Sequence, residues 1–194
     1  MASTPPRPPE DAPPATRPLV ETRLVVIVAG VGLIAIAALV ASLFRDPGVP
    51  AAVSRDYSRV AGRVLRPDVE ASDPAALTAA LDARQPGIDA RVPDLAAAGY
   101  RLAGGTVRDV DGHAGVLVVY HNALQDLLVW QAYRGNVSDL PDTSDVRRHE
   151  GRRYYVHRKA ASILVFWQDG PRVLVVTSSL PAEQVVKLAY QATS

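Results

Sequence analysis

The sequence predicts an α+β protein, in which one transmembrane helix is followed by a single domain with an antiparallel sheet packed against helices. Three observations lead to this fold class. Residues 24–44 form an apolar run without a charged residue. After residue 100, short runs rich in β-branched residues alternate with turn sequences. Segments near residues 74 and 182 carry the signals that begin helices, and helices flanking a run of antiparallel strands are typical of the α+β class.

The apolar run of residues 24–44, which stands between Arg23 and Arg45, predicts a membrane span. These 21 residues would rise about 31 Å as a helix, which is enough to cross the hydrocarbon layer. A cleaved signal peptide is the alternative, with Ala35-Ile36-Ala37 as its cleavage site. The apolar character continues well past that site, so we expect a retained anchor.

The rest of the chain divides around this span. Residues 1–23 form a Pro-rich tail, for which we expect disorder with polyproline II character. Residues 45–68 are predicted to be a partly helical juxtamembrane linker, either an amphipathic helix whose arginines meet lipid phosphates or an ordinary linker helix. Residues 69–194 are long enough to form one α+β domain.

The predicted order in this domain is a helix, a run of antiparallel strands and a final helix. Asp73 and Pro74 are typical of a helix start, and this helix should extend to about Ala83. The dipeptide Asp111-Gly112 predicts a hairpin turn. We expect strands over residues 115–120, 124–133, 153–156, 161–167 and 172–177, a surface loop over residues 135–150, and a closing helix over residues 182–190. The helices are expected to cover one face of one open sheet.

The composition limits the chemistry of the chain. The formal net charge is +1, with 21 Lys and Arg against 20 Asp and Glu, so nucleic acid is not an expected partner. The absence of cysteine excludes disulfides, thiolate zinc sites and cysteine nucleophiles. The sequence contains no nucleophile elbow, phosphate-binding loop or calcium-binding loop. We therefore expect a protein without catalytic residues and without a cofactor.

Two groups of residues are candidates for a binding site. His121 and His157 fall in or near predicted strands and could be neighbours across a sheet, where imidazoles could bind copper, nickel or zinc; isolated surface histidines are the alternative. The second group consists of four arginines that could meet anionic lipid or an acidic partner: Arg147, Arg148, Arg152 and Arg153. At a sheet edge, the same arginines could instead prevent pairing with another strand by like charge.

Two stretches of the predicted domain have a specific order of turns and strands. The first is VPDLAAAGYRLAGG, residues 92–105, followed after Asp111-Gly112 by the strand 115–120. The second is WQDGPRVLVVTSSLPAEQ, residues 167–184, a strand, hairpin, strand and helix. Together they resemble the extracytoplasmic domain of bacterial transmembrane anti-sigma factors, and the similarity covers about residues 69–189.

This resemblance implies a single-pass protein of the bacterial inner (cell) membrane, with the C-terminal domain outside the cytoplasm. The orientation is taken from the resemblance. The positive-inside rule does not favour it, because more arginines follow the span than precede it. Members of this family usually begin with a cytoplasmic zinc-binding domain built on His and Cys. This sequence has no cysteine and no histidine before His113, so the resemblance does not extend to that zinc-binding domain.

The functional hypothesis is a non-catalytic envelope domain that senses a signal or binds a partner, and that regulates an extracytoplasmic-function sigma factor. The alternative is a structural or accessory subunit of a membrane protein complex. The expected partners are the lipid bilayer and a protein, either a sigma factor or subunits of a membrane complex. Small residues four apart, such as Ala37 and Ala41, would also allow a homodimer through the span.

Overall fold

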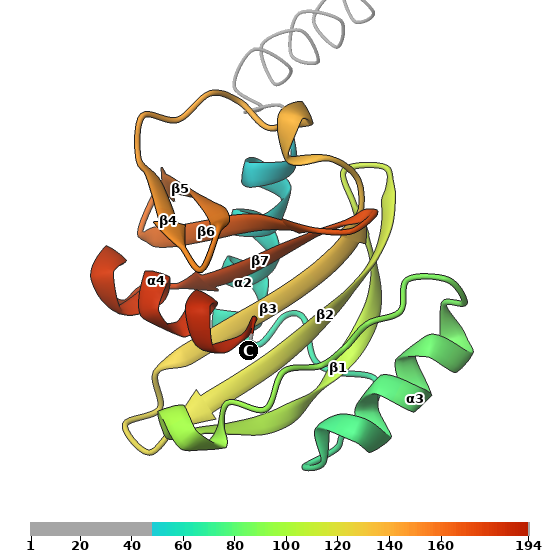
Figure 1. The fold of residues 1–194 in the computed structure, drawn as a ribbon. Helices are drawn as coiled ribbons and strands as arrows, with labels where there is room; N and C mark the ends of the chain where they lie inside the picture. Colours follow the sequence, from blue (N-terminus) through green and yellow to red (C-terminus); the bar gives the residue numbers. More distant parts are fainter. Residues whose placement is uncertain (1–47, 194) are drawn as a thin grey trace, which may run out of the picture. The chain divides into compact units, whose positions relative to one another are not determined.

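Residues 48–193 are described by the computed structural model, and one seven-stranded sheet forms their centre (Figure 1). The strands are β1 (Tyr100–Val110), β2 (His113–Asn122), β3 (Leu127–Arg134), β4 (Val146–His149), β5 (Arg152–Lys159), β6 (Ser162–Asp169) and β7 (Arg172–Ser178). They lie in the order β1-β2-β3-β7-β6-β5-β4, and every neighbouring pair is antiparallel. The chain therefore continues after β3 to the far edge, β4, and returns strand by strand until β7 pairs with β3.

The predicted tail and the predicted span, residues 1–23 and 24–44, lie outside the described residues, as do residues 45–47 of the predicted linker. Within residues 48–193, no helix is both long enough and apolar enough to cross a membrane.

Helices cover both faces of the sheet, which corrects the expectation that they cover only one. The helices are α2 (Val49–Ala61), α3 (Pro74–Arg84) and α4 (Ala182–Gln191), with short 3-10 turns η1 (Ala96–Ala98) and η2 (Val137–Asp139). In Figure 1, α3 and α4 lie on the near face and α2 lies behind the sheet. The physical reason is that the central strands are buried on both sides. Strand β7 is buried along its whole length and β3 at every position but the last. Strands that are apolar on both sides need cover on both faces.

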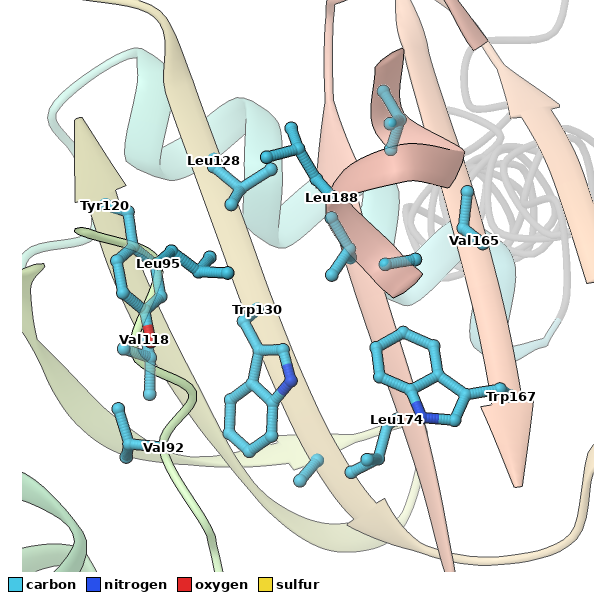
Figure 2. Packing of buried hydrophobic residues seen from close by; sticks show 14 of the residues in the cluster. Val92, Leu95, Val118, Tyr120, Leu128, Trp130, Val165, Trp167, Leu174 and Leu188 are labelled. Carbon is cyan, nitrogen blue, oxygen red and sulfur yellow. The ribbon is translucent and has the colours of Figure 1, made fainter. Parts of the chain in front are cut away.

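The core on the face of α3 and α4 is built around two tryptophans. Figure 2 shows Trp130 on β3 and Trp167 on β6, with Leu174 of the intervening strand β7 and Leu188 of α4 beside them. Trp130 is 1% exposed and Trp167 is fully buried. Leu95, from the segment between α3 and β1, packs in the same cluster and so links both helices to one core.

The opposite face is covered by α2, which falls within the predicted linker but belongs to the compact unit of residues 47–194. Val53, Tyr57 and Val60 recur at helical spacing, and all three are buried. Val53 belongs to a cluster with residues of β6 and β7, and Tyr57 and Val60 belong to one with residues of β2 and β3. The apolar side of α2 therefore faces the sheet, and its arginines Arg55 and Arg59 are exposed.

A buried charged group also joins α2 to the sheet. The Asp56 side chain is 6% exposed and accepts a hydrogen bond of 2.7 Å from Nη2 of Arg108 on β1. Its second oxygen accepts a bond of 3.2 Å from Nε2 of the fully buried Gln131 on β3. At the next residue of α2, the Tyr57 hydroxyl accepts a bond of 3.0 Å from the backbone N–H of Ser179. These bonds fix the rotation of α2 about its axis, which apolar packing alone would leave less specific.

Several sequence predictions are confirmed in detail. The helix predicted from Pro74 to Ala83 is α3, and the Asp73 carboxylate caps it by accepting a 2.8 Å bond from the N–H of Ala76. Asp111-Gly112 connects β1 to β2, and the closing helix is α4. The loop expected over residues 135–150 is partly wrong, because it contains η2 and the edge strand β4.

The free edge of β1 is partly covered by a short bridge. The N–H of Val69 donates to the carbonyl of Gly105 at 3.0 Å, and the N–H of Gly105 donates back at 2.9 Å. Gly104 lies at the bulge of β1 with a φ of 141°, and a Cβ there would lie 2.2 Å from the carbonyl oxygen of Val69. Only glycine allows this close approach, which explains the Gly104-Gly105 pair.

Candidate functional site

The two histidines proposed as metal ligands are not neighbours. His121 lies on β2 and His157 on β5, and β3, β7 and β6 separate these strands. Four strand spacings amount to about 19 Å, far beyond the reach of one ion. Among residues 48–193, no group of three or more His, Asp or Glu could hold a metal ion. The prediction that His121 and His157 meet across the sheet is therefore wrong.

His157 has a structural environment instead. Its ring lies edge-on against Phe166 at 5.4 Å, and the residues that the structure describes offer its Nε2 no hydrogen-bond partner. Burial lowers the pKa of His157, and the nearby Lys159 lowers it further. The side chain is thus held in its neutral form at neutral pH.

Replacement of His157 by Gln is expected to reduce the loss of stability in mild acid. As the pH falls below about 6.5, the unfolded chain binds a proton at this position more readily than the folded chain, so the free energy of unfolding decreases until the folded-state pKa is passed. Urea unfolding between pH 8 and pH 5 should show a smaller decrease for His157→Gln than for the wild type. Equal decreases in the two proteins would contradict this assignment.

The four arginines proposed for partner binding lie on one hairpin, formed by β4 and β5 and here named the basic hairpin (residues 146–159). Arg147 is bound within the fold, because it forms ion pairs with Asp145 at 2.7 Å and with Glu183 of α4 at 3.1 Å. The hydrogen bond from Arg147 lowers the pKa of the Asp145 carboxyl, and Arg158 adds to this effect. Arg147 therefore attaches the hairpin to α4.

The other three arginines are exposed. Arg148 on β4 lies directly opposite Arg153 on β5, and Arg152 lies opposite His149. Within the described part of the chain, Arg148, Arg152 and Arg153 form no ion pair with a carboxylate. The structure thus separates the four candidates into one structural arginine and three exposed ones.

A groove of about 570 Å³ lies between α4 and the turn that joins β2 to β3. Tyr100 and Leu188 are its buried lining residues, and Leu180 adds a half-buried apolar surface. The remaining lining includes a polar and more exposed set: Asn122, Asp126, Gln184, Lys187 and Gln191. Sequence reasoning missed this groove, because its residues come from three distant segments that only the fold brings together.

The turn beside the groove is held by its own hydrogen bonds. Oδ1 of Asn122 accepts bonds from the N–H groups of Leu124 at 2.9 Å and Asp126 at 2.8 Å, and its Nδ2 donates to Asp126 at 2.8 Å. This arrangement presents Leu124, which is 82% exposed, at the groove. Asn122 is the residue in the sequence that could have predicted this turn, since Asn favours Asx turns.

The groove offers both apolar and polar side chains to a ligand. Burial and the nearby Asp126 raise the pKa of Tyr100, so its hydroxyl stays protonated at neutral pH and can donate a hydrogen bond. An apolar lining with a few polar groups at the margin is typical of binding pockets, and the volume falls in their usual range of about 300 to 1,000 Å³. The arrangement can therefore bind a side chain or short segment of a partner.

Comparisons with protein-family models, with curated proteins and with solved structures found nothing that matches this chain.

Proposed function

We propose that this chain is a single-pass protein of the bacterial cell membrane, whose outer α+β domain is a non-catalytic module that senses a signal or binds a partner. The observation that carries the proposal is the groove beside α4, with the exposed Leu124 held at it. The resemblance of residues 92–105 and 167–184 to the outer domain of anti-sigma factors supports the same role.

The sequence supports a position close to a membrane. The apolar run ends at Phe44, and α2 begins at Val49, five residues later. Five extended residues reach at most about 18 Å, so the domain would lie close to the bilayer surface. Along the chain, α2 is the first described helix after the predicted span, and it packs on the sheet through its apolar side.

Regulation would then follow from occupancy of the groove. A partner outside the cytoplasm would change the contacts of the domain, and the span would pass this change to whatever binds residues 1–23. The inner partner in this scheme is an extracytoplasmic-function sigma factor. Subunits of a membrane complex are the alternative partners, in which case the domain is a scaffold.

The outer partner can be tested by photo-crosslinking from the groove in intact membranes. The full chain would carry a photo-reactive amino acid at Leu124, and the matched control would carry it at Val64, another exposed apolar residue at 72% exposure. We expect a specific adduct from Leu124 that is absent from Val64. Equal adducts from both positions, or none from Leu124, would reject the groove as the binding site.

The inner partner requires a second measurement. Pull-down of the full chain, with residues 2–22 present or deleted, should recover a sigma factor only when the tail is present. Recovery of membrane subunits in fixed stoichiometry, independent of the tail, would instead support the accessory role. These two results separate the regulatory function from the structural one.

A further inference from the structure

We infer that two exposed arginines of the basic hairpin, Arg148 and Arg153, bind the phosphates of anionic phospholipids. The inference rests on the proposed function, because it assumes that residues 24–44 anchor the chain in a bilayer. It adds a second contact between the protein and its membrane, made by the folded domain itself.

The charge of the basic hairpin is strongly one-sided. Residues 146–159 contain six Arg and Lys residues and one acidic residue, Glu150, whereas the whole chain has a net charge of only +1. Asp145 forms ion pairs with Arg147 and Arg158. The charges of the remaining three arginines are therefore available to a ligand outside the described residues.

The placement of two of these arginines is unfavourable without such a ligand. Arg148 and Arg153 are directly opposed across β4 and β5, and like charges in this position destabilise a hairpin. Protection of the sheet edge does not explain the pair, since that role needs charge only on the edge strand β4, whereas Arg152 and Arg153 lie on β5. A phosphate between the two guanidinium groups would turn this repulsion into attraction, and guanidinium groups bind phosphate oxygens in bidentate fashion.

The position of the pair favours lipid as the source of phosphate. On β5, the side chains of Arg153 and Tyr155 lie on the same face, because side chains alternate along a strand. Tyr155 packs against the cluster that contains Val49, the first residue of α2. The predicted span ends only five residues before Val49, so the head groups of the anchoring membrane are the phosphates nearest to this face.

The test uses the full chain in lipid nanodiscs that contain either phosphatidylcholine alone or equal parts of phosphatidylcholine and phosphatidylglycerol. Because the chain has no cysteine, Val146→Cys gives a single site for a fluorophore. Val146 is 40% exposed and lies on the same face of β4 as Arg148. Quenching by a head-group quencher should be stronger in the discs with phosphatidylglycerol and should weaken as salt is added.

The decisive variant carries Arg148→Gln and Arg153→Gln. It should lose the preference for phosphatidylglycerol, because each arginine removed lowers the ratio of docked to undocked domain about fivefold. The matched control carries Arg84→Gln and Arg101→Gln, which removes two exposed arginines elsewhere and changes the net charge equally. This control should keep the preference. The charge-conserving double change of Arg148 and Arg153 to Lys should keep only part of it, because a lysine ammonium cannot bind phosphate in bidentate fashion.

The possible failures are distinguishable. A chain that stays in the discs but shows equal quenching in both lipids rejects only the head-group contact. An equal loss in both double Gln variants also rejects it, because the effect would then depend on overall charge. A chain that is removed from the discs by alkaline carbonate overturns the proposed anchor, and the inference falls with it.

Discussion

Replacement of Asp56 by Ala is expected to lower the free energy of unfolding by about 3 kcal/mol. The carboxylate is 6% exposed and accepts hydrogen bonds from both Arg108 and Gln131. Its removal would leave the Arg108 guanidinium, whose side chain is 25% exposed, without its anion, and would leave the buried Gln131 amide without an acceptor. An unpaired buried charge and an unsatisfied buried amide each carry a desolvation cost. Urea unfolding followed by circular dichroism measures the effect.

Two controls make this expectation specific. Asp142 is an exposed carboxylate that forms no ion pair among the described residues, and its change to Ala should alter the free energy of unfolding by less than about 0.5 kcal/mol. A double variant, Asp56→Ala with Arg108→Met, should recover part of the loss, because no unpaired charge remains. If Asp56→Ala costs no more than Asp142→Ala, the buried group does not hold α2 to the sheet.

This group is also relevant to signalling. In the proposed function, α2 is the segment through which the domain and the span are coupled, so it must stay attached to the sheet when a partner binds. The side chains of two consecutive residues, Asp56 and Tyr57, attach α2 to β1, to β3 and to the end of β7. A variant that loosens α2 should therefore weaken coupling while the groove, which lies beside α4, remains formed.

Local signals predicted much of the fold. The cap at Asp73, the hairpin turns at Asp111-Gly112 and Asp169-Gly170, and the helix start at Ala182 are all read from a few neighbouring residues, and the structure has each of them. Helical spacing of Val53, Tyr57, Val60 and Val64 likewise predicts a helix within the linker; α2 contains the first three and ends at Ala61, before the exposed Val64. Such signals depend on backbone preferences that act over a few residues, so they survive in any tertiary context.

The arrangement of these elements depends on long-range contacts and could not be predicted in the same way. Insertion of β7 between β3 and β6 separates the strands of His121 and His157, which no local pattern indicates. The strand β4 has four residues and an exposed Val146, so it lacks the apolar alternation that marks a strand. The groove has the same origin, because it exists only where α4 and the β2–β3 turn meet.

One missed feature did have a signal in the sequence. Gln131 is a polar residue inside the run LLVWQAY, residues 127–133, which the structure buries completely. A buried amide needs a partner from outside its own strand, and the carboxylate of Asp56 supplies it. A single polar residue in an otherwise apolar central strand therefore indicates a polar contact from a covering helix, and so a covered second face.

Replacement of Trp130 by Ala is expected to cost about 4 kcal/mol of unfolding free energy and to lower the Tm by about 10 °C. The indole is 1% exposed at the centre of the core on the face of α3 and α4, where Figure 2 shows it between Val118 and Leu174. Its removal would leave a cavity that neighbouring strands, fixed by their hydrogen bonds, cannot close. Thermal unfolding followed by circular dichroism gives the Tm, and urea unfolding gives the free energy.

Trp130→Phe is the matched change, and we expect it to cost only about 1 to 2 kcal/mol. Within residues 48–193 the indole Nε1 has no hydrogen-bond acceptor, so Phe removes volume without breaking a hydrogen bond inside the described fold. The exposed Leu124, changed to Ala, should leave the Tm nearly unchanged, although it is also a large apolar residue. If Trp130→Ala and Leu124→Ala have similar effects, the core does not depend on the indole. If Trp130→Phe costs as much as Trp130→Ala, the indole N–H itself contributes to stability.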